Sequence, residues 1–306
     1  AQITDNGTVD SAFVVYSVDN GPFQAVQMAA DPGDSIYTGT IPPQADGAFV
    51  KYYLRAVDND GDVAVMPDTT GGMFFYVVRD GGLSIADVQW TPFEYDNSGY
   101  EGLEVTIQGI AVTDTSDFPG YYVLMDAAEP WHGIVVRDAA HTVRPGDEVR
   151  VTATVQEYFG MTRLNYVTDF QLISVGNEVP GPIVVNTGDL ATGSPTAESY
   201  EGCFVEVRDV TVTIPFPDAP SNYGEFVVDD GTGGVRVDDI GNFGGQTSDT
   251  TFHEGDKISI LRGILYYTYG NYKIEPRNEG DVIGHTTGVA TASGTPHTYE
   301  LSQNYP

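Results

Sequence analysis

Groups of neighbouring carboxylates are the side chains of this sequence that could most directly hold a metal ion. Three groups stand out: Asp58, Asp60 and Asp62; Asp229 and Asp230; and Asp238 and Asp239. Calcium prefers such hard oxygen ligands. However, Thr69 occupies the twelfth place, where an EF-hand loop has its Glu, and the Asp-Asn-Asp-Gly of residues 58–61 is also typical of a tight turn. A calcium site and a plain turn both remain open interpretations.

Histidine and cysteine give no pattern for catalysis. The five histidines fall singly, and the sequence contains no His-Glu-x-x-His, His-x-His or Gly-x-Ser-x-Gly motif. Cys203 stands in a strand-like apolar segment, which favours a buried small hydrophobic residue over a nucleophile. We therefore expect a protein that is not an enzyme.

Aromatic side chains gather around two predicted hairpin turns. Around Gly270 stand Tyr266, Tyr267, Tyr269 and Tyr272, whereas around Gly160 stand Tyr158, Phe159 and Tyr166. Exposed rings could stack on a glycan, but Tyr is also enriched where domains or subunits meet. Trp131 looks like the most exposed large ring and is a further candidate contact residue.

Charge narrows the range of partners. The chain has 13 basic and 44 acidic side chains and a formal net charge of −31, so it repels phosphate backbones and anionic lipid surfaces. We expect no nucleic-acid partner. The sequence also lacks an apolar run of about 18 residues, which argues against membrane insertion. Its single cysteine cannot form an internal disulfide.

Two segments of the chain repeat. Residues 98–113 align without a gap with residues 198–213, and further matches continue downstream to residues 145–151 and 254–260. Both copies read as short strands with period-two alternation between Gly, Pro and Asp clusters. The predicted fold class is all-β, with one domain in residues 84–175 and its repeat in residues 184–284.

The first strand of each copy changes its inward-facing phase partway along. The inward sets are Leu103, Val105 and Ile107 followed by Ile110 and Val112, and Val205 and Val207 followed by Val210 and Val212. This change predicts a bulge at Gly109 and at Asp209, where a long strand bends. The order of a long bent strand, a hairpin and two more strands resembles the OB-like barrels of secreted bacterial proteins, which often stand beside extracellular nucleases.

The N-terminal part, residues 1–79, has a different pattern. Apolar strands flank the hairpin signal Asp19-Asn20-Gly21, and residues 49–57 form a strand before the turn at 58–61. This region resembles an immunoglobulin or fibronectin type III-like sandwich. In such modules the stretch that resembles residues 1–7 normally lies partway along the second strand. The first strand is therefore missing here. The unpaired backbone then needs another segment to cover it.

The last residues resemble the opening of a sorting domain. Residues 297–306, which end in Leu-Ser-Gln-Asn-Tyr-Pro, are similar to the start of the C-terminal sorting domain of the type IX secretion system. The resemblance implies a bacterial protein exported to the cell surface or the medium. The sequence stops before the usual Asn-Pro-Phe continuation and begins with Ala1, so we expect a processed or trimmed chain.

Together these features predict an extracellular structural protein. A neighbour could supply the missing strand by β-augmentation next to Ile3 and Val9, and the donor would be residues 285–306, where Thr298, Tyr299 and Leu301 alternate with polar residues. Such head-to-tail pairing does not close and would build a filament of identical copies. The alternative is a non-catalytic module, derived from a secreted nuclease or hydrolase, that binds a glycan or another polymer.

Overall fold

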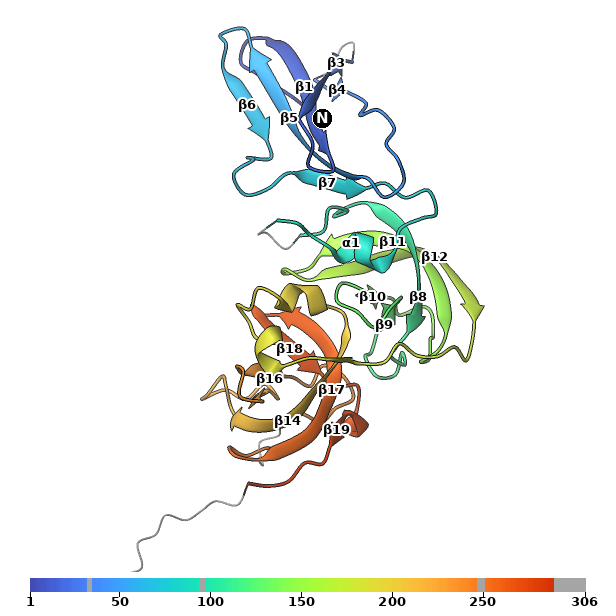
Figure 1. Ribbon diagram of the computed structural model, residues 1–306, viewed down its shortest axis with the longest axis vertical. Coiled ribbons are helices and arrows are strands. Elements are labelled where there is room, and N and C mark those ends of the chain that lie inside the picture. The colour runs from blue at the N-terminus through green and yellow to red at the C-terminus, as the bar shows by residue number, and fades with distance from the viewer. Residues whose placement is uncertain (32–34, 94–96, 247–250, 289–306) are drawn as a thin grey trace, which may run out of the picture.

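The computed structural model describes residues 1–31, 35–93, 97–246 and 251–288. It is all-β, with 43% strand and 6% helix, and it contains two closed five-stranded barrels. Both of these predictions are therefore confirmed. Three units follow one another along the long axis of the molecule (Figure 1). No helix among the described residues is long and apolar enough to cross a membrane.

The N-terminal unit is built on one five-stranded sheet. Its strands are β1 (Val9–Val18), β2 (Gln24–Gln27), β5 (Phe49–Asp58), β6 (Val63–Met66) and β7 (Phe74–Val77). The order is β2-β1-β5-β6, and β7 pairs with β5 beside β6. Asp19 and Asn20 both have positive φ, as the tight β1–β2 turn requires. Both predicted elements, the hairpin and the long strand before residue 58, are confirmed.

A smaller layer covers part of this sheet. It consists of β3 (Ala29–Ala30), β4 (Tyr37–Thr38) and the first residues of the chain. The backbone amide of Tyr37 donates to the carbonyl of Ala1, and that of Ile3 donates to Ser35. Ile3 packs with Tyr37 against a small core of Ala12, Val14 and Met28. The N-terminal residues therefore belong to the second layer, but that layer is short.

The repeat forms two barrels with the same strand order. The first barrel contains β8 (Glu104–Ala111), β9 (Tyr121–Met125), β10 (Gly133–Arg137), β11 (Glu148–Glu157) and β12 (Thr162–Ser174), and it closes as β10-β12-β11-β8-β9. The second contains β14 (Phe204–Ile214), β15 (Phe226–Asp229), β16 (Val235–Val237), β17 (Lys257–Thr268) and β18 (Asn271–Glu275), closed by pairing of β14 with β17. In each barrel the third and fifth strands pair in parallel.

Short elements link and extend these units. Two short helices, α1 (Ile85–Gln89) and α2 (Thr187–Leu190), precede the first and the second barrel, and the 3₁₀ turn η1 (Ala197–Tyr200) lies just before β14. The strands β13 (Ile183–Val184) and β19 (Val282–Ile283) extend the second sheet, and η2 (Glu279–Asp281) precedes β19.

The predicted bulge at Gly109 is wrong. The pairing of β8 with β11 keeps one register through Gly109, and Gly109 itself is buried between Ile107 and Ala111, so the inward phase does not change there. A Cβ at Gly109 would press on Ile85 of α1, which packs over this position. Glycine there makes room for α1. The register of the first barrel shifts instead in β12, where Tyr166 has φ +53°.

In the second copy the phase change occurs where it was predicted. Arg208 and Asp209 are exposed in succession, and Asp209 has φ +51°. The pairing of β14 with β17 nevertheless keeps one register across this point. The side chains of β14 that face inward therefore change from odd-numbered to even-numbered residues at Asp209, but no extra residue is inserted into the pairing of β14 with β17.

A capped helix connects the N-terminal unit to the first barrel. The hydroxyl of Ser84 accepts a hydrogen bond from the backbone amide of Asp87, and the Asp87 carboxylate accepts one from the Ser84 amide, which is a capping box. Arg79 donates to both oxygens of the same carboxylate, at 2.6 and 2.9 Å. The rings of Phe49 and Phe75 each pack edge to face with Trp90. These ring contacts and the hydrogen bonds together hold the junction.

The two barrels touch backbone to backbone, and one face of the first barrel packs into the core of the second, while the first barrel keeps a core of its own. A Cβ at Gly133 would overlap the carbonyl of Gly202, so these glycines permit the close approach. Gln89 donates from its side chain to the carbonyls of both Gly133 and Glu201. Val123, Met125, Val135 and Met161 of the first barrel belong to the same buried cluster as the core of the second barrel. The barrels therefore form one packed body.

Candidate functional site

The aspartates of the first acidic group serve the β5–β6 turn. The Oδ1 atom of Asp58 accepts hydrogen bonds from the backbone amides of Asp60 and Asp62, both at 2.8 Å. Asp60 and Asp62 contribute their amides to this arrangement. Among the described residues, no group of three or more His, Cys, Asp or Glu side chains is placed to hold a metal ion. The geometry accounts for this cluster as a turn.

Asp229 and Asp230 also hold a turn, between β15 and β16. Asp229 accepts from the amides of Gly231 and Gly233, and Asp230 accepts from the amide and hydroxyl of both Thr187 and Thr232. Burial of Asp230 acts to raise its pKa, but these hydrogen bonds to the charged form outweigh it and leave the pKa lowered. Asp230 thereby fixes α2 to the second barrel.

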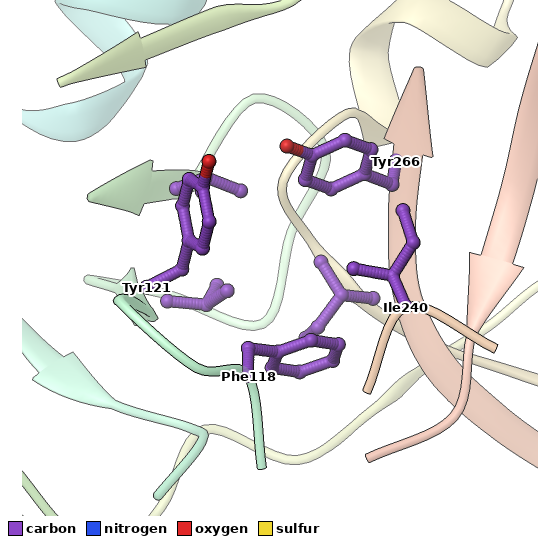
Figure 2. Close-up of a pocket in the computed structure, with 7 residues that line it drawn as sticks. Phe118, Tyr121, Ile240 and Tyr266 are labelled. Atoms are coloured by element: carbon purple, nitrogen blue, oxygen red, sulfur yellow. The ribbon is translucent and has the colours of Figure 1, made fainter. Parts of the chain in front are cut away.

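The predicted aromatic candidates separate into different roles. Tyr266 lies across an apolar cleft from Tyr121, so the two rings come from different barrels, with Phe118 and Ile240 closing the cleft (Figure 2). Burial raises the pKa of Tyr266 to about 12. Tyr267 packs where the Gly160 hairpin tip of the first barrel approaches. Both rings join the barrels, which matches the alternative role of a contact between domains.

The remaining rings of that group differ in exposure. Tyr272 is only 7% exposed, and its hydroxyl donates to Glu198, so it is a core residue of the second barrel. Tyr269 is 90% exposed at the tip of the β17–β18 hairpin. Tyr158 is partly exposed, and the Arg163 guanidinium lies 3.6 Å from the centre of its ring. Of these three, Tyr269 is the ring most available to a ligand.

Trp131 is half-buried, contrary to its exposed appearance in the sequence. Its backbone amide donates to Ser199, and its φ of +72° places it in the left-handed region. The ring lines a cleft with Phe49, Arg79 and Trp90 between the N-terminal unit and the first barrel. Trp131 therefore lies where the N-terminal unit, the β9–β10 loop of the first barrel and the η1 turn before the second barrel meet.

The described histidines pair with aspartates. His132 lies 2.6 Å from Asp126, and His285 lies 2.9 Å from Asp256. Asp256 is buried, which acts to raise its pKa, but the amide of His253 and the contacts with His285 and Gly288 outweigh burial and lower the pKa to about 2. This carboxylate fastens residues 285–288 to the second barrel.

The N-terminal sheet ends in an apolar edge strand. β6 has the sequence Val-Ala-Val-Met, and all four residues are exposed, Met66 by 63%. Its inner edge pairs with β5, and no strand in the described ranges pairs with its outer edge. A flat apolar edge with free backbone groups is a surface on which another strand can pair.

A groove of about 290 Å³ opens at the start of this edge strand. Val9, Ala56 and Val63, from three neighbouring strands, line it together with residues 3–5. The predicted assembly residues Ile3 and Val9 thus lie on one groove. The predicted donor residues Thr298, Tyr299 and Leu301 lie outside the described residues.

A second cavity, which the sequence did not suggest, opens on the second barrel. It has a volume of about 460 Å³ and lies between the β14–β15 loop, β16 and the β17–β18 hairpin. Asp218, Glu225 and Asp238 line it, together with Arg236 and Lys273. Lys273 is 35 residues from Asp238 in the sequence, and the pairing of β16 with β18 brings it beside the other four.

Ion pairs order the charged wall of this cavity. Arg236 donates to Asp218 and Glu225, and the buried ammonium of Lys273 lies between Glu225 and Asp238. Burial acts to lower the pKa of Lys273, but the two carboxylates outweigh it and raise the pKa. Burial raises the pKa of Glu275, behind the wall, well above its usual range.

In comparisons with known proteins, no family model matches this chain, and neither the curated proteins nor the solved structures give a significant match.

Proposed function

We propose that this chain is a non-enzymatic, extracellular structural subunit that assembles with copies of itself by β-strand addition. The observation that carries the proposal is the apolar edge strand β6 next to the open groove at Ile3 and Val9. An edge strand with unpaired backbone groups and exposed apolar side chains is a template on which another chain can pair. An added strand satisfies the backbone and covers the groove at once.

The occupant of this edge is the C-terminal segment of a neighbouring copy. The sequence of residues 298–301 alternates polar and apolar side chains, as a strand with one buried face requires. The strand β19, which precedes this segment in the chain, lies at the opposite end of the molecule from β6 (Figure 1). A donor and an acceptor at opposite ends give head-to-tail contacts, which continue into a filament.

The finer fold assignments support an extracellular setting. Five strands whose third and fifth members pair in parallel agree with an OB-like barrel, and the two-layer N-terminal unit agrees with an immunoglobulin-like sandwich with an incomplete second layer. Both resemblances, and that of residues 297–306 to a type IX sorting signal, come from bacterial proteins that are exported. We propose the cell surface or the medium as the location.

The first test is the state of association of three proteins: the intact chain, a chain without residues 289–306, and Val65→Lys. Light scattering and negative-stain imaging should show long particles for the intact chain only. Removing residues 289–306 deletes the donor, and a lysine in β6 blocks the edge. Val175→Lys, which adds the same charge at an exposed site of the first barrel, should still form particles.

A peptide with the sequence of residues 289–306 provides the matching test in trans. It should bind the shortened chain and stop growth of the intact one, because it occupies β6. Circular dichroism checks that each variant remains folded. An intact chain that stays at about its own mass of 32.9 kDa at every concentration would rule out the assembly.

A further inference from the structure

The charged cavity on the second barrel has the form of a small-molecule site. Its volume of about 460 Å³ falls within the range of pockets that hold small ligands. Tyr223 and Tyr269, which are 67% and 90% exposed, stand at its rim, and Asn271 and Lys273 lie on β18 inside it. The cavity thus combines exposed rings with polar side chains that ion pairs already hold in place.

The first barrel serves as an internal control for this arrangement. The strand registers make Glu225, Arg236 and Lys273 equivalent to Tyr121, Val135 and Arg163. In the first barrel this face carries Tyr121 and Val135 in the apolar cleft against the second barrel (Figure 2). The same face of the second barrel is charged and open.

The charges are not needed to close a barrel of this kind. The first barrel closes with a tyrosine and a valine at two of the three positions. A buried ion pair loses the hydration of both charges and is often no more stabilising than an apolar pair of similar size. Glu225 and Arg236, which stand where the first barrel has Tyr121 and Val135, therefore point to a role other than stability. The third position keeps a buried cation in both barrels, Lys273 and Arg163, which are 2% and 3% exposed.

We propose that this cavity binds a neutral carbohydrate. Sugar hydroxyls donate and accept hydrogen bonds, so they can use the carboxylates of Asp218 and Glu225 as well as the donors of Arg236 and Asn271. The apolar faces of a sugar ring pack on aromatic rings, which Tyr223 and Tyr269 supply.

The same inventory disfavours other classes of ligand. Three carboxylates against two cationic groups in the lining, on a chain of net charge −31, oppose an anionic ligand. A fully apolar ligand would strip water from Arg236 and from the carboxylates without replacing their hydrogen bonds. A neutral molecule rich in hydroxyl groups avoids both costs.

Isothermal titration calorimetry on the full chain tests this proposal. The probes are four neutral tetrasaccharides, namely cellotetraose, maltotetraose, mannotetraose and fully N-acetylated chitotetraose, with tetragalacturonate as the anionic comparison. At least one neutral probe should bind, and Tyr269→Ala should weaken it about tenfold. Tyr269 is at an exposed hairpin tip, so its replacement leaves the fold intact.

Tyr166→Ala is the matched control, because Tyr166 is 66% exposed with positive φ on the first barrel. It should bind the same probe as tightly as the unchanged protein. The proposal is overturned if no neutral probe binds more tightly than about 10 mM, if only tetragalacturonate binds, or if Tyr269→Ala leaves the affinity unchanged. None of these outcomes depends on whether the chain forms filaments.

Discussion

The carboxyl group of Asp239 lies in surroundings that favour its protonated form. Burial first, and then the negative charge of the adjacent Asp238, raise its pKa from 3.8 to about 6. The side chain sits closely between the backbone at Gly224 and Gly245. The folded protein therefore holds a proton at Asp239 between about pH 4 and pH 6 that the unfolded chain releases.

Asp239→Asn should stabilise the protein in a pH-dependent way. Because the folded pKa is above the unfolded one, the charged form costs stability; this cost is absent below about pH 4 and complete above about pH 6. After allowance for partial exposure, we expect the free energy of unfolding to rise by about 1–2 kcal/mol at pH 8 and little at pH 4. Urea unfolding at both values measures this. Exposed Asp10→Asn is the control, and an equal gain at both pH values would contradict the assignment.

At the scale of elements, the barrels meet at glycines, which have no side chain to hold the two backbones apart. Gly133 of β10 and Gly202 before β14 let the two backbones meet, and Gln89 bridges them with hydrogen bonds to both sides. Gly109 plays a similar part beneath Ile85. In the sequence these glycines look like turn or bulge residues, because a lone glycine gives no sign of which segment packs on it.

Gly133→Ala should lower the stability of the paired barrels. The added methyl group would overlap the Gly202 carbonyl, so the barrels must separate, which costs about 1–3 kcal/mol. The φ of Gly133 is not positive, so a loss of stability on substitution measures the contact with Gly202 and not backbone strain. Thermal and urea unfolding measure it. Gly181→Ala, at a site with open space around the added methyl, should have almost no effect, and equal losses in both variants would argue against this contact.

At the scale of the whole molecule, the charge opposes assembly while the edge strand favours it. Every copy carries a net charge of −31, so copies that approach head to tail repel one another. This repulsion reaches about 30 Å at 0.01 M salt and about 10 Å at 0.1 M. The strand pairing that we propose at β6 acts only at short range.

Association should therefore increase with salt. Raising sodium chloride from about 10 to 300 mM should speed the appearance of large species in light scattering, because screening removes the barrier to encounter. The shortened chain without residues 289–306 should show no such response, since it lacks the proposed donor segment. Growth that slowed with salt would indicate that ion pairs, and not a strand on an apolar edge, hold the copies together.

The sequence by itself determined the class and the repeat of this protein. Alternating side chains, Gly-Asp turns and the match of residues 98–113 with 198–213 predicted an all-β chain with two copies of one domain, because period-two patterning is a local property. The prediction that each copy closes into a barrel came from the resemblance to OB-like barrels. The Asp19-Asn20 hairpin followed in the same way from the backbone angles that its turn requires. The sequence left open whether each aspartate cluster binds calcium or forms a turn, since both use the same residues.

Only the tertiary structure decided which side chains meet. It turned Tyr266 and Tyr267 into contacts between barrels, buried Tyr272, and left Tyr269 exposed. It also gathered Glu225 from the β14–β15 loop, Arg236 from β16 and Lys273 from β18 around a cavity. These outcomes depend on how the barrels close and which faces they bury against each other, and contacts between residues so far apart leave no periodic signal in the sequence.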